Sequence, residues 1–129
     1  METKILEVNG ESLALARDII LGGGLVAMPT ETVYGLGADG TNGEAVKKIY
    51  AVKGRPTDNP LIAHVHKDFD LNKLVFIEQS YAEELKKAFM PGPLTMVFPK
   101  SDIVPYGTTG GLDTVAVRMP NHPVALELI

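Results

Sequence analysis

Two cationic side chains, Lys53 and Arg55, stand two residues apart in the segment 53–60, which also holds two prolines. Lysine offers a compact charge, and the planar guanidinium of arginine matches the geometry of a carboxylate or phosphate. Asn59 can both donate and accept hydrogen bonds, as the recognition of a base or ribose requires. The pattern predicts an anion-binding loop, although two cations could also complement the dipole at the end of a helix. The chain has no GxxxxGK[ST] phosphate-binding motif.

The segment 29–37, PTETVYGLG, is a second candidate binding loop because it combines hydroxyls, a carboxylate, a phenol and two glycines. Hydroxyls such as that of Thr32 suit a small polar ligand at the end of a strand, and glycines let the backbone approach it. A plain connection between a strand and a helix would need similar turn residues. The Gly35-x-Gly37 pair alone is a weak signal for a dinucleotide site.

Two further candidates lie on predicted strands. His64 and His66 are two residues apart, so they would share one face of a strand. A third ligand at suitable spacing is absent, so we predict no metal site and expect a hydrogen-bonding or structural role for these histidines. Arg118, near the end of a strand that begins at Thr114, needs an anion in its apolar setting. That anion could be a protein carboxylate or a ligand carboxylate.

Helix and strand signals alternate along the chain. Apolar periodicity predicts four helices: one capped by Asn9 and Ser12, one that follows Asn42 and stops at Gly54 and Pro56, one near 80 and one from 122. Short apolar runs predict strands at 25–28, 61–65, 94–98 and 114–119. Alternation of this kind predicts an α/β fold with a parallel or mixed sheet covered by helices. Ligands bind such sheets beyond the strand ends, so we expect loops 29–40, 53–60 and 105–114 to share one site.

Composition limits the class of protein. The 129 residues are 45% hydrophobic and 22% charged, which is typical of one globular domain. The absence of cysteine excludes disulfides, thiolate nucleophiles and cysteine-bound zinc. A net charge of −4 argues against a broad nucleic-acid-binding face. The longest apolar stretch, 19–29, is broken by three glycines, so we expect no membrane span and a cytoplasmic protein.

Four segments together resemble the YrdC family. They are PTETVYGLGA at 29–38, AVKKIYAVKGRPTDNPLIAHV at 45–65, PGPLT at 91–95 and GLDTVAVRMPNHP at 111–123. They occur in the family's order, and the second is the most specific. The resemblance covers nearly the whole chain and implies one YrdC-like domain over residues 1–129, with a twisted mixed or parallel sheet flanked by helices around a cationic cavity.

The resemblance also implies an enzyme. Members of this family condense L-threonine, bicarbonate and ATP to threonylcarbamoyl-adenylate and pyrophosphate, a nucleotidyl transfer that serves the threonylcarbamoyladenosine modification of tRNA. The expected cofactor is Mg²⁺ bound to the ATP, with no protein metal site. The expected partners are the three substrates and downstream tRNA-modification proteins, and weak RNA binding is compatible with the family.

Residue roles carried over from the family fall on the segments above. The side chains that would contact threonine are Thr32, His64 and Arg118. Those that would contact ATP are Arg55, Asn59 and Thr114, while Lys53 joins Arg55 as the catalytic cationic pair.

The chain departs from the family pattern at two places. Thr57 stands where many relatives have serine, and this threonine retains the hydroxyl group. Relatives also continue into a Ser-x-Asn motif that lies against nucleotide and threonine, and nothing after Ile129 supplies it, so we expect a domain that is incomplete at its C-terminus. The alternatives are a non-catalytic module of the same fold that binds nucleotide or double-stranded RNA, and an inactive fragment. Similar domains also occur in hydrogenase maturation proteins that form carbamoyl-adenylate.

Overall fold

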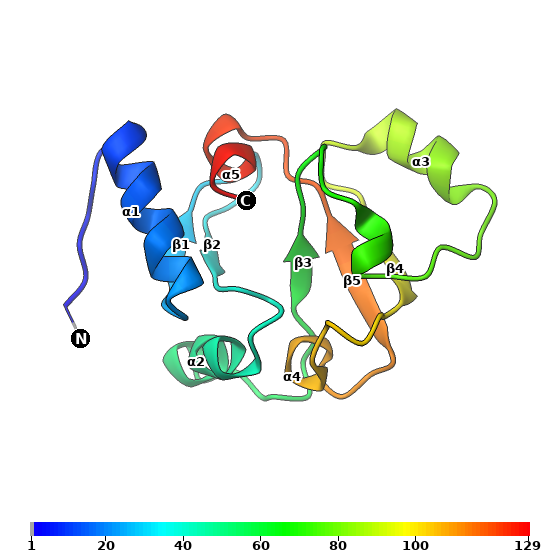
Figure 1. Ribbon diagram of the computed structural model, residues 1–129, viewed down its shortest axis with the longest axis horizontal. Coiled ribbons are helices and arrows are strands. Elements are labelled where there is room, and N and C mark those ends of the chain that lie inside the picture. Colours follow the sequence, from blue (N-terminus) through cyan, green and yellow to red (C-terminus); the bar gives the residue numbers. More distant parts are fainter. Residues whose placement is uncertain (1) are drawn as a thin grey trace.

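Two small β-sheets lie side by side in the structure, a computed structural model that describes residues 2–129 (Figure 1). In the first sheet, β1 (Val26–Met28) pairs antiparallel with β2 (Gly35–Gly37). The second has the order β3-β5-β4, with β3 (Ile62–His64) parallel and β4 (Thr95–Pro99) antiparallel to β5 (Thr114–Arg118). The predicted α/β fold with a mixed sheet is therefore confirmed, but the strands form two sheets and not one continuous sheet.

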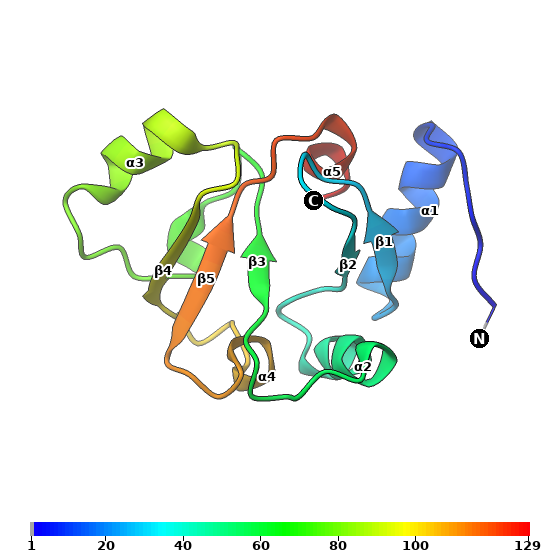
Figure 2. The same cartoon turned by 180° about the vertical axis from the view of Figure 1, so that it is seen from behind.

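Helices surround the two sheets. They are α1 (Gly10–Leu21), α2 (Gly43–Lys53), the single-turn 3₁₀ helix η1 (Leu71–Lys73), α3 (Ala82–Phe89), α4 (Tyr106–Thr109) and α5 (Pro123–Leu128). The short elements α4, η1 and β2 fall in segments where the sequence predicted only connections. In both views α2 and α4 lie at the opposite end of the sheets from α5 (Figure 2).

The capping residues place α1 and α2 as the sequence predicted. The Asn9 side chain accepts a hydrogen bond from the backbone N–H of Ser12 at 2.9 Å, and the Ser12 hydroxyl accepts one from the Asn9 backbone N–H in return. Asn42 caps α2 by accepting from the backbone N–H groups of Glu44 and Ala45. Gly54, with φ of +59°, ends α2 in the left-handed conformation that glycine adopts without steric cost. This turn directs the chain into the segment that carries Arg55.

The hydrophobic core covers one face of the three-stranded sheet. Alternate residues of β5, Val115 and Val117, are buried and pack with Phe98 of β4. Because side chains alternate along a strand, Arg118 lies on the face opposite to this core. The register pairs His64 of β3 with Arg118 of β5, so these two side chains are neighbours on that opposite face. The sheet register therefore brings together two residues that are far apart in the sequence.

Helix α1 is the least buried long helix. Its apolar positions, among them Ile19, follow helical spacing, but no α1 residue is buried and Ile19 remains 38% exposed. Lys48 of α2 ties the end of α1 to the rest of the molecule, because its Nζ donates a hydrogen bond to the carbonyl oxygen of Gly23 at 2.6 Å.

Among residues 2–129, none of the helices has both the length and the apolar character needed to cross a membrane.

Candidate functional site

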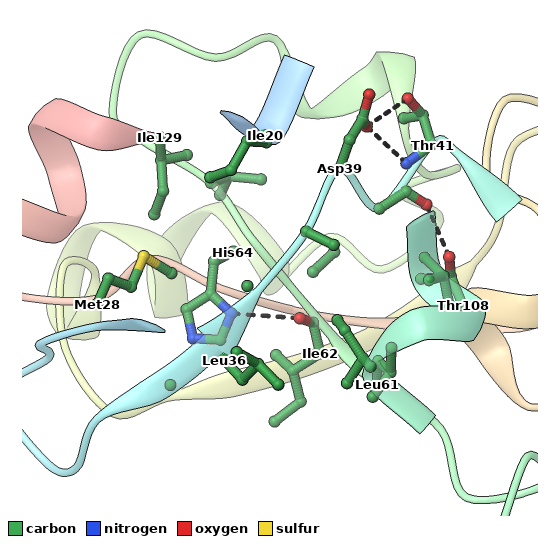
Figure 3. Close-up of a pocket in the computed structure, with 18 of the residues that line it drawn as sticks. Ile20, Met28, Leu36, Asp39, Thr41, Leu61, Ile62, His64, Thr108 and Ile129 are labelled. Carbon is green, nitrogen blue, oxygen red and sulfur yellow. Dashed lines mark hydrogen bonds between the residues drawn. The ribbon is translucent and has the colours of Figure 1, made fainter. Parts of the chain in front are cut away.

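A cavity of about 580 Å³ lies between the two sheets. Residues of β2 and β3 line it, and α2, the loop 38–41, α4 and the end of α5 also contribute to the wall. Figure 3 shows His64 among the side chains of this wall, with apolar neighbours such as Met28 and Leu36. The size is typical of a pocket for a small molecule or cofactor, and the wall combines apolar surface with a few polar groups.

Two cations contribute to the wall at its α2 end. Lys53 is the last residue of α2, and Arg55 follows the glycine that ends this helix. The Nη2 atom of Arg55 donates to the carbonyl oxygen of Pro60 at 2.8 Å, whereas its buried Nε has no hydrogen-bond partner among the described residues 2–129. None of the salt bridges found among residues 2–129 includes Lys53 or Arg55. A guanidinium with an unused, buried N–H beside a cavity favours the binding of an anion.

Hydrogen bonds to backbone carbonyls hold the surrounding loops together. The hydroxyl oxygen of Tyr50 lies 3.0 Å from the carbonyl oxygens of both Asn59 and Gly107, and its single proton is donated to this pair. The Thr108 hydroxyl donates to the carbonyl oxygen of Gly40 at 2.7 Å, and the Thr108 carbonyl accepts from the backbone N–H of Leu61. Helices α2 and α4 thus fix the loops that follow β2 and precede β3.

His64 presents a neutral ring to the cavity. Burial lowers the pKa of His64 below the ordinary value of 6.5, and a backbone hydrogen bond to Ile62 opposes this shift. The Nδ1 atom lies 3.2 Å from the Ile62 carbonyl oxygen, drawn as a dashed line in Figure 3. A neutral ring that donates from Nδ1 to this carbonyl keeps Nε2 as a hydrogen-bond acceptor.

The anion that pairs with Arg118 is a side chain of the protein. Its Nη2 atom donates to the carboxylate of Glu31 and lies 3.4 Å from the hydroxyl oxygen of Thr32, and its Nε donates to the carbonyl oxygen of Gly92 at 3.2 Å. The sequence left open whether the partner of Arg118 is a protein or a ligand carboxylate. The structure supplies Glu31, from the same loop as Thr32.

The structure brings some of the sequence-predicted residues together and leaves others apart. Lys53, Arg55 and His64 line the cavity, and Arg118 is next to His64 in the sheet register. Asn59 is exposed and contributes only its backbone carbonyl to the contacts described above.

Thr114 is also apart from this group, because it lies at the other end of β5 from Arg118 and pairs with Pro99. Four residues along a strand correspond to roughly 13 Å. The expectation that loop 105–114 shares the site is met through Thr108 of α4, which lines the cavity.

His64 and His66 do not form the shared face that the sequence suggested. β3 ends at His64, and His66 instead accepts a hydrogen bond from the backbone N–H of Asp68 and packs against the ring of Phe69. Across residues 2–129, no cluster of three His, Cys, Asp or Glu side chains is placed to hold a metal ion.

The sequence reasoning missed one acidic residue of the site, Asp39, and the partner of another, Glu31. Asp39 lines the cavity, and its Oδ1 accepts hydrogen bonds from the backbone N–H and hydroxyl of Thr41. Glu31 was visible in the sequence as the carboxylate of the loop 29–37, but its partner lies 87 positions away.

The lowered pKa of His64 predicts a loss of stability in acid. In the unfolded chain the His64 ring takes up a proton near the ordinary pKa of 6.5, whereas burial in the folded protein opposes protonation of the ring. The stability that the neutral ring contributes is therefore complete above pH 6.5 and declines as the pH falls below that value. Denaturant unfolding of wild type and His64→Gln from about pH 8 to about pH 5 measures the effect. The variant should lose less stability over this range, and identical pH profiles would contradict the assignment.

Comparisons with known proteins match almost the whole chain. The family model Sua5_yciO_yrdC, described as telomere recombination, matches residues 18–129. A threonylcarbamoyl-AMP synthase of Pyrococcus abyssi is 56% identical over 117 residues, which cover 91% of this chain and 34% of that protein. One of Bacillus subtilis is 48% identical over 128 residues, covering 98% of this chain and 37% of the relative.

A solved structure, the crystal structure of P. abyssi Sua5 complexed with L-threonine, superposes with a TM-score of 0.91 at 52% identity. The match covers 96% of this chain and 36% of that one. The chain therefore spans about a third of the length of these relatives.

Proposed function

Because this chain belongs to the Sua5, YciO and YrdC family, we propose that it forms the substrate-binding domain of a threonylcarbamoyl-AMP synthase. In this proposal the protein condenses L-threonine, bicarbonate and ATP to threonylcarbamoyl-adenylate and releases pyrophosphate. The product would then serve proteins that modify tRNA. The identities of 56% and 48% with synthases support the activity, and the geometry of the cavity supports its assignment to particular residues.

The observation that carries the proposal is the state of Arg55. This cavity-lining guanidinium has a buried Nε without a hydrogen-bond partner, and Lys53 lines the same wall. A triphosphate would satisfy that N–H and bring its negative charge to both cations. We therefore assign the phosphates of ATP to the α2 end of the cavity. Asn59 and Thr114 remain candidate contacts to the nucleoside.

The opposite end of β3 suits an amino acid. His64 supplies a neutral ring with one nitrogen available as an acceptor. Arg118 is its register partner at the end of β5, and the Thr32 hydroxyl oxygen lies 3.4 Å from Nη2 of Arg118. A crystal structure of the P. abyssi relative holds L-threonine, which supports an amino-acid site in this domain. The three side chains proposed to bind threonine are Thr32, His64 and Arg118.

The proposed reaction forms no covalent intermediate with the protein, and it requires the three substrates to be aligned. The amine of threonine attacks the carbon of bicarbonate, a carbamate forms, and water leaves. A carbamate oxygen then attacks the α-phosphorus of ATP, the bond to the β-phosphate breaks, and pyrophosphate departs. Lys53 and Arg55 would stabilise the negative charge that develops on the phosphates, because cations fixed beside a largely apolar cavity do so without rearrangement.

The cavity wall fits a magnesium ion that is held by the nucleotide. Of the described residues that line the cavity, Asp39 is the acidic one, and a single carboxylate with phosphate oxygens and water is a common environment for Mg²⁺. When bound, the ion would supply charge neutralisation to the phosphates. Asp39 would hold its hydration shell, and the Thr41 hydrogen bonds would orient this carboxylate.

Pyrophosphate release tests the proposed function. With the full-length natural protein, ATP should yield pyrophosphate only when threonine and bicarbonate are both present, because the carbamate is the nucleophile. A coupled pyrophosphate assay with each substrate omitted in turn provides the measurement. Equal release without threonine would remove threonine from the reaction, and tight, salt-sensitive RNA binding without turnover would favour a non-catalytic module.

A further inference from the structure

Glu31 connects two parts of the chain beyond the end of β5. One carboxylate oxygen, Oε1, accepts a hydrogen bond from Nη2 of Arg118, and the other, Oε2, accepts one from the backbone N–H of Asn121. The side chains of Arg118 and Glu31 are only 12% and 22% exposed. Both carboxylate oxygens are thus engaged in a largely buried and electrically neutral pair.

The contacts of Arg118 occupy the side of the guanidinium that a carboxylate binds best. Its Nε donates to Gly92, and its Nη2 donates to Glu31. A ligand carboxylate that binds arginine with two parallel hydrogen bonds uses such a pair of neighbouring N–H groups. It would have to share Arg118 with Glu31 or replace it, and two carboxylates at one cation repel each other.

Glu31 also lies at the amino-acid end of the cavity. Thr30, its neighbour in the chain, lines the cavity, and Arg118 is in register with the cavity-lining His64. The loop around Glu31 is a compact turn, in which the Thr30 hydroxyl oxygen accepts hydrogen bonds from the backbone N–H groups of Thr32 and Val33. Release of the Glu31 carboxylate would free this turn from Asn121 and Arg118.

We propose that Glu31 sets the affinity of the site for an amino-acid carboxylate by competing with that carboxylate for Arg118. The inference rests on the proposed function, since it takes threonine as the ligand at this end of the cavity. Glu31 is then a specificity-determining residue, because an amino-acid carboxylate reaches Arg118 only by replacing the carboxylate of Glu31.

Calorimetry with two ligands tests the competition in the full-length natural protein. Glu31→Gln retains the size of the side chain but removes the charge and one of the two acceptor oxygens, so L-threonine should bind about fivefold more tightly or better. L-threoninol, which lacks the carboxylate, should bind wild type and variant alike. The control Glu83→Gln removes a similar charge from the exposed pair with Lys86 on α3 and should change neither affinity. Unchanged or weaker threonine binding by Glu31→Gln, or an equal gain for threoninol, would overturn the inference.

Hydrogen exchange of the wild-type protein tests the same idea without a substitution. The Asn121 amide is bonded to Glu31, so threonine should speed its exchange whereas threoninol should not. Unchanged or slower exchange of this amide with threonine contradicts the competition. A wild type that binds neither ATP nor threonine rejects the proposed function and this inference together. A wild type that binds both, with no response to Glu31→Gln, rejects this inference alone.

Discussion

Replacing Arg55 with alanine should weaken ATP binding by about 1–3 kcal/mol, which is roughly a 5- to 150-fold rise in the dissociation constant. The reason is that the substitution removes a guanidinium whose buried Nε has no hydrogen-bond partner in the part of the chain that the structure describes. Calorimetric titration of the full-length natural protein with ATP measures the effect. Arg55→Lys should recover only part of the affinity, because lysine keeps the charge but cannot form the two-point contact.

Two controls accompany this experiment. Arg17→Ala removes a cation from an exposed pair with Asp18 on α1 and should leave ATP affinity unchanged. Thermal unfolding of Arg55→Ala checks the fold, because the substitution also removes the hydrogen bond to the Pro60 carbonyl. A folded Arg55→Ala protein with wild-type ATP affinity would remove Arg55 from the site.

Gly110→Ala should destabilise the protein by about 2–5 kcal/mol, the sum of a left-handed backbone cost of about 1–2 and an overpacking cost of about 1–3. Gly110 ends α4 with φ of +63°, and a Cβ atom there would lie 2.7 Å from the carbonyl oxygen of Asp58. That oxygen belongs to the loop that carries Arg55. Denaturant unfolding measures the loss, and ATP affinity should fall as the loop is displaced.

Gly111→Ala is the matched control for this effect. Gly111 also has a positive φ, +88°, but a Cβ atom there would meet nothing within 4 Å. Gly111→Ala should therefore lower the free energy of unfolding only by the cost of the left-handed backbone, roughly 1–2 kcal/mol. If the two variants were equally stable, the close approach between α4 and the loop at Asp58 would play no part in stability.

Much of the secondary structure followed from local signals. Asn9, Asn42 and Gly54 mark helix ends through hydrogen bonds and backbone freedom that depend on neighbouring residues only, and each lies where the sequence predicted. β2 was missed because Gly-Leu-Gly has no strand periodicity, and its pairing depends on β1. The exposure of α1 was missed as well, since periodicity indicates which face is apolar but not what covers it.

The arrangement of the site was harder to predict from neighbouring residues than the helix ends were. The residue types of Lys53 and Arg55 pointed to an anion, and these two lie close in the chain. The adjacency of His64 and Arg118 depends on the register of β3 and β5, which β4 separates along the chain, and spacing cannot specify that register. The choice of Glu31 as the partner of Arg118 depends on the same long-range packing.

A crystal structure of the full-length natural protein with L-threonine and a non-hydrolysable ATP analogue tests the central claim most directly. The phosphates should contact Lys53 and Arg55, and the threonine carboxylate should contact Arg118 next to His64, with both ligands inside the cavity between the sheets. Ligands bound elsewhere on the molecule, with Arg55 Nε still unpaired and the cavity unfilled, would contradict the account.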